Sequence, residues 1–76
     1  MQQLTKKFSE VLNTHLNELD MPESTRERAI ILSKILDIPK QHAWNLLEGH
    51  LYPDEQLLQK IANLLEVDAN SLKNKH

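Results

Sequence analysis

The chain has 76 residues, of which 39% are hydrophobic, 26% charged and 4% aromatic. A chain of this length can build one small hydrophobic core, so two independent domains are excluded and residues 1–76 are interpreted as a single domain. The lack of cysteine excludes disulfides, thiolate zinc sites and cysteine nucleophiles. No run of about 18 uncharged apolar residues is present, and the sequence therefore predicts a cytoplasmic protein without a membrane segment.

The charge balance argues against general nucleic-acid binding. Nine Lys and Arg residues stand against eleven Asp and Glu residues, which gives a net charge of -2. Because general binders of nucleic acid are usually basic, any DNA binding must come from a local arrangement of residues. One glycine and three prolines, among many leucines, lysines and glutamates, favour helices over strands. The predicted fold class is all-α, a compact bundle of four to five short helices.

The first two predicted helices cover residues 4–19 and 25–36, where apolar residues recur every three or four positions. The apolar stripe of the first helix consists of Phe8, Val11, Leu12, Leu16 and Leu19. Ser24 precedes the second helix, and Glu27 lies three positions after Ser24. This is the spacing at which the two side chains cap the start of a helix reciprocally. The residues expected to face inward on the second helix are Ala29, Leu32, Ser33 and Leu36.

A tight break separates the second helix from a third. Asp37 tolerates the left-handed conformation better than most residues, and Pro39 suits the first position of a helix. The third helix is therefore predicted over residues 39–48. Gly49, the only glycine in the chain, is the expected residue just beyond its end.

The remaining sequence predicts a core helix and a short final one. Residues 54–65 carry the broadest apolar face in the chain, formed by Leu57, Leu58, Ile61, Ala62, Leu64 and Leu65. Asp68 is a suitable cap for a last helix that ends at residue 72, and residues 73–76 have the composition of a frayed tail.

Residues 25–48 have the pattern of a helix-turn-helix, in which a short connection joins two short helices and glycine closes the second. The face of the second helix expected to be buried carries Ala43, Leu46 and Leu47. The opposite face carries Gln41, Trp44, Asn45 and Glu48. Gln41 and Asn45 are candidate readers of DNA bases, because a side-chain amide can bond to N6 and N7 of adenine together. Lys40 can reach guanine or phosphate.

The positions of the apolar residues, glycine and proline form an irregular series that spans three turns. They are Leu36, Ile38, Ala43, Leu46, Gly49, Pro53, Leu58, Ile61, Ala62, Leu65, Val67 and Leu72. Residues 25–72 resemble the Cro and phage-repressor (XRE-type) helix-turn-helix domains in the spacing of these positions, and no gap is needed to match them. The resemblance implies a lambda-repressor-like bundle, in which the helix of residues 39–48 enters the DNA major groove and the helix of residues 25–36 crosses the backbone.

The same resemblance implies a function and a set of binding residues. It indicates a bacterial or phage transcriptional regulator that binds double-stranded DNA in a sequence-specific manner. The positions that match base-reading places are Lys40, Gln41, Trp44 and Asn45. The positions that match phosphate-binding places are Ser24, Thr25, Arg26, Arg28, His50 and Tyr52. Because a single module of this size covers little DNA, a homodimer on paired half-sites is expected.

A second function, protein–protein interaction through the same fold without DNA binding, fits the acidic balance and the position of Glu48. Trp44 would then anchor the interface. Trp44 has three candidate environments, which are a partner surface, the helix of residues 25–36, and a thymine methyl group. Gln41 and Asn45 are also compatible with a solvated pair one helical turn apart.

Catalysis, cofactor binding and metal binding are not expected. The serine, aspartate and histidine residues lack a nucleophile elbow or oxyanion loop, and one glycine excludes a glycine-rich phosphate loop. The histidines have no short helical spacing and no convergent carboxylates nearby. They are His15, His42, His50 and His76.

Overall fold

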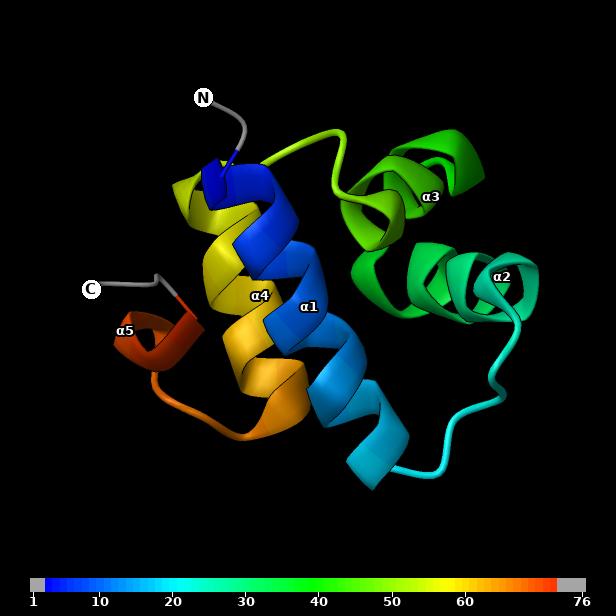
Figure 1. Ribbon diagram of the computed structural model, residues 1–76, viewed down its shortest axis with the longest axis horizontal. Helices are drawn as coiled ribbons and strands as arrows, with labels where there is room; N and C mark the ends of the chain where they lie inside the picture. The colour runs from blue at the N-terminus through cyan, green and yellow to red at the C-terminus, as the bar shows by residue number, and fades with distance from the viewer. Residues whose placement is uncertain (1–2, 73–76) are drawn as a thin grey trace.

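Helices account for most of residues 3–72, the part of the chain that the computed structural model describes (Figure 1). In that part the chain forms α1 (Gln3–Glu18), α2 (Thr25–Leu36), α3 (Lys40–Glu48), α4 (Glu55–Leu65) and α5 (Ala69–Leu72), with no strand. The expected all-α bundle of short helices is therefore confirmed. The predicted tail of residues 73–76, which includes His76, lies outside the described residues.

The apolar stripes of all five helices meet in one core. Its buried members are Phe8, Leu12, Leu16, Ala29, Leu32, Leu36, Ala43, Leu46, Leu47, Leu57, Leu58, Ile61, Ala62, Leu65 and Leu72. The prediction was wrong for Leu19, whose side chain is 50% exposed. The reason is that α1 ends at Glu18, so Leu19 lies in the turn after the helix, where Asp20 takes a left-handed conformation (φ 61°).

Local signals in the sequence set most of the helix ends. The Ser24 hydroxyl accepts a hydrogen bond from the Glu27 N–H (3.3 Å), and α2 ends at Asp37 with φ 60° and ψ 50°, as expected for a left-handed cap. Gly49 closes α3 with φ 81°. Pro39 differs from the prediction, because its extended backbone (ψ 150°) makes it the residue before the helix, and α3 begins at Lys40.

Two neighbours hold α3 in place. Figure 1 shows α2 and α3 together on one side of α1, and both α1 and α2 pack against α3. At Gly49 the chain passes so close to α1 that an added Cβ would lie 3.1 Å from Ser9 Oγ and 3.4 Å from Lys6 Cα. Three residues after Gly49, the Tyr52 ring packs edge to face against the Phe8 ring, with the ring centroids 5.5 Å apart. These contacts fix the inner side of α3 and leave its outer side uncovered.

Candidate nucleic-acid interface

The two faces of α3 differ as the periodicity predicts. Ala43, Leu46 and Leu47 are all at most 5% exposed. On the outer face, Lys40, Gln41 and Glu48 are exposed, Trp44 is 38% exposed and Asn45 is half-buried. A helix of about 10–12 Å diameter with side chains fits a major groove about 12 Å wide. The outer face of α3 can therefore approach base edges.

The two candidate base readers contact each other. The Gln41 side-chain amide donates a hydrogen bond to Asn45 Oδ1 at 3.3 Å. This bond is the solvated pair that the sequence offered as an alternative to base reading. It uses one Gln41 N–H and one lone pair of the Asn45 oxygen, so the Gln41 carbonyl and the Asn45 amino group remain for a base edge. Mutual bonding also restricts the rotamers of both side chains, which lowers the entropy cost of ordering them on DNA.

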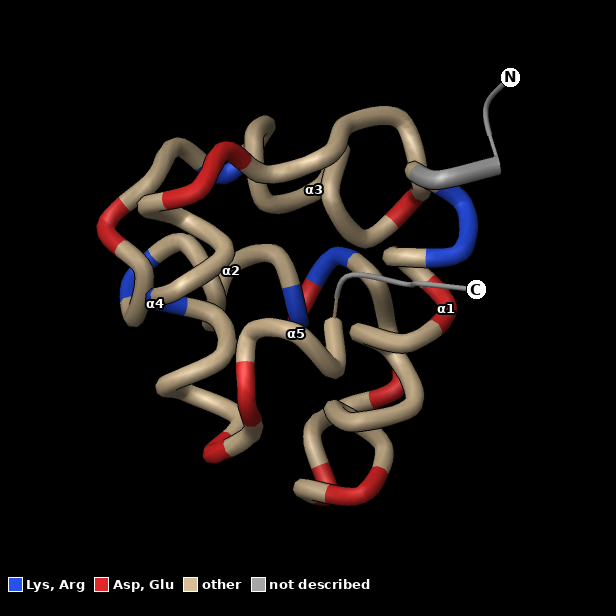
Figure 2. The backbone as a smooth tube through the Cα atoms, turned by 90° about the vertical axis from the view of Figure 1, so that its left-hand side faces the viewer, with Lys and Arg blue, Asp and Glu red and all other residues tan. Residues whose placement is uncertain are grey.

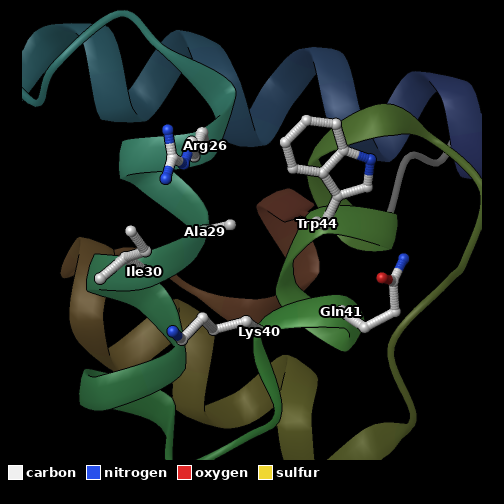
Figure 3. Close-up of a pocket in the computed structure, with 6 residues that line it drawn as sticks. All are labelled: Arg26, Ala29, Ile30, Lys40, Gln41 and Trp44. Carbon is white, nitrogen blue, oxygen red and sulfur yellow. The ribbon is translucent and has the colours of Figure 1, made fainter.

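A cleft of about 200 Å³ lies beside this pair, between the outer surfaces of α2 and α3 (Figure 3). Its lining consists of Arg26, Ala29, Ile30, Lys40, Gln41 and Trp44. Figure 3 shows Arg26 and Lys40 at opposite ends, with the Trp44 indole leaning over the cleft from α3. Trp44 therefore covers part of the seam with α2 and still presents more than a third of its surface to solvent. The sequence alone did not indicate that Ile30 belongs to this surface.

Five of the six predicted phosphate-binding residues lie at two places, the start of α2 and the loop after α3. Ser24, Thr25 and Arg26 lie at the start of α2, where Arg26 is exposed and the Ser24 oxygen serves as the helix cap. Free backbone N–H groups at a helix start favour phosphate binding. His50 is exposed in the loop after α3, and the half-buried Tyr52 packs its ring on the core.

Arg28 is a correction to the predicted set, because it is buried (4% exposed) and faces the interior. Its guanidinium donates hydrogen bonds to the Pro22 carbonyl (2.5 Å), to Asn13 Oδ1 (2.8 Å) and to Asn17 Oδ1. In this position it cannot hold a phosphate. The spacing offered a signal that was missed, since Arg28 precedes the core residue Leu32 by one helical turn and so lies on the inward row.

Asn13 extends this network to α3. Its amino group donates to the Ser9 carbonyl (2.9 Å) and to the Leu47 carbonyl (3.2 Å), while its oxygen accepts from Arg28. One amide therefore connects α1 with both helices of the helix-turn-helix. The network sets the position of α3 from behind, and none of its donors lies on the outer face.

Several of the acidic residues lie far from α3. Figure 2 shows acidic positions at the lower end of the molecule, in the loops that follow α1 and α4, whereas α3 lies toward the upper end. These loops contain Asp20, Glu23, Glu66 and Asp68. Asp54 caps α4, Glu55 is the first residue of that helix, and Glu48 lies on the outer face of α3 itself. Exposed cations at Arg26 and Lys40 still border the cleft.

Neither a metal-binding cluster nor a membrane-spanning helix is found in the described part of the chain. Residues 3–72 contain no group of three or more His, Asp or Glu side chains placed to share a metal ion. His15 Nδ1 lies 3.8 Å from Glu18 Oε1, which makes a pair and not such a group. None of the helices α1 to α5 is both long and apolar enough to cross a membrane. Comparisons of the chain with family models, with curated proteins and with solved structures give no match.

Proposed function

We propose that the protein binds double-stranded DNA in a sequence-specific manner, as a transcriptional regulator of a bacterium or phage. The observation that carries the proposal is the outer face of α3, where the Gln41 and Asn45 amides bond to each other. Gln41 also lines the cleft that the exposed cations Lys40 and Arg26, the latter from α2, border. Amides supply base-specific hydrogen bonds and cations supply phosphate contacts, which are the two components of specific DNA binding. The resemblance of residues 25–72 to phage-repressor domains points the same way.

In the proposed complex α3 enters the major groove and the start of α2 lies on the backbone. Gln41 and Asn45 bond to base edges, Arg26 contacts phosphate, and Lys40 contacts guanine or phosphate. A single module of this kind buries about 600–1,000 Å² on DNA, so two copies on half-sites about 34 Å apart are expected for tight binding.

The first experiment is selection of binding sites from a random duplex library with the purified protein at moderate salt. The expected result is an enriched palindromic site whose affinity falls steeply between about 50 and 200 mM salt. Absence of any enriched duplex, together with no binding to random duplex at low salt, would refute the proposal. That result would favour the alternative, in which the partly exposed Trp44 anchors a protein partner.

The second experiment uses a matched pair of surface amides as its control. Gln59 and Asn63 on α4 repeat the arrangement of Gln41 and Asn45, with an exposed amide pair one turn apart at 3.5 Å. Gln41→Ala is expected to weaken binding to the selected site by about 1–3 kcal/mol and to change binding to random duplex little. Gln59→Ala should leave both affinities unchanged. Equal losses on selected and random duplex would remove Gln41 from the base readers.

A further inference from the structure

The cleft between α2 and α3 combines an apolar wall with positive charge at both ends. Ala29 is 3% exposed and Ile30 is half-buried, and the Trp44 indole leans over the cleft from the opposite side (Figure 3). Arg26 and Lys40 occupy the two ends, and none of the described residues that line the cleft is acidic. The complementary ligand has an apolar group at its centre and negative charge on both sides.

Double-stranded DNA offers one apolar group on its major-groove base edges, the 5-methyl group of thymine. Successive phosphates of the same strand supply negative charge along the groove. From this match we propose that the cleft receives a thymine methyl group, with backbone phosphates of that strand on Arg26 and Lys40. The inference rests on the proposed function and adds a base identity to it, a thymine next to the base that Gln41 contacts.

Size and chemistry support this occupant. A methyl group fills only part of about 200 Å³, and the sugar on the 5′ side of a thymine, which lies against the methyl in B-form DNA, adds further apolar surface. The Trp44 indole supplies the wall on α3, because Gln41 is directed away from α2 in Figure 3. Removing one methyl-sized group from water corresponds to about a fourfold gain in affinity. Truncation of Trp44 should abolish that gain.

The test replaces thymine by deoxyuridine in the selected duplex, one position at a time. This change removes the methyl group and keeps every hydrogen-bonding group of the base. We expect one position in each half-site to lose about fourfold in affinity, while the other positions change little. Trp44→Ala should bind the thymine and deoxyuridine duplexes equally. Gln59→Ala, on the exposed surface of α4, is the matched control and should keep the fourfold difference.

The outcomes separate this inference from the proposed function. If the selected duplex binds and no thymine position responds to loss of its methyl group, the methyl site is refuted and sequence-specific binding stands. If Trp44→Ala keeps the preference for thymine, the methyl contacts another part of the protein and the inference is also wrong. If no duplex binds at low salt, both proposals fail. Circular dichroism of Trp44→Ala verifies that the variant is folded.

Discussion

Arg28 is expected to stabilise the fold without contacting DNA. Arg28→Ala removes three hydrogen bonds from a buried guanidinium, to Asn13, Asn17 and the Pro22 carbonyl. A hydrogen bond to a charged group contributes about 1.5–3 kcal/mol. Asn17 and Pro22 are exposed and can bond to water after the substitution, so only the half-buried Asn13 loses its partner at full cost. Loss of packing by the aliphatic part of the Arg28 side chain adds to the loss of stability, whereas removal of a buried charge offsets part of that loss.

The net effect is a loss of about 2–3 kcal/mol in the free energy of unfolding. For a domain of this size each kcal/mol changes Tm by about 4–8 °C, so a fall of about 10–20 °C is expected. Urea denaturation followed by circular dichroism measures the free energy, and a thermal scan measures Tm. Arg28→Lys should be no more stable than Arg28→Ala. The compact lysine ammonium cannot reach three separate acceptors as the guanidinium does, and it leaves a buried charge poorly paired.

Arg26→Ala is the matched control, since Arg26 is exposed two residues earlier on the same helix. It should change stability by no more than about 0.5 kcal/mol and should weaken duplex binding uniformly across sequences. The reasoning is refuted if Arg28→Ala unfolds cooperatively with a loss below about 1 kcal/mol. It is equally refuted if Arg28→Lys matches the stability of the unsubstituted protein.

Two further pairs of substitutions test how the helices pack. Gly49→Ala should cost about 1–2 kcal/mol because φ is 81°, and adding Ser9→Ala should restore only the part due to the 3.1 Å approach of Ser9 Oγ. Full restoration in urea denaturation would mean that the backbone conformation is not strained. Leu32→Ala should cost about 2–5 kcal/mol, whereas Ile35→Ala on the same helix, 51% exposed, should stay within about 0.5 kcal/mol. Similar losses for both would contradict the packing of α2.

The sequence alone was sufficient for the parts of the structure that depend on neighbours along the chain. The bounds of α2, the left-handed ends at Asp37 and Gly49, and the buried face of α3 all follow from helical periodicity and from the φ preferences of single residues. These are local properties, because a helix forms hydrogen bonds within itself and its apolar row must find a core somewhere. The choice of Gln41 and Asn45 as candidate readers came from the same periodicity.

Tertiary structure decided what the helical pattern leaves open, namely which neighbour covers each face. Arg28 has the charge of a phosphate ligand, yet Asn13 and Asn17 of α1 draw it into the interior. Leu19 continues an apolar stripe, yet it lies in the turn after α1, where half of its surface stays exposed. The cleft under Trp44 exists because α2 and α3 converge with a small residue at the seam, Ala29. Contacts between residues distant in sequence determine each of these environments. The helical period can place Arg28 on the inward row, but it cannot identify the residues of another helix that cover a given face.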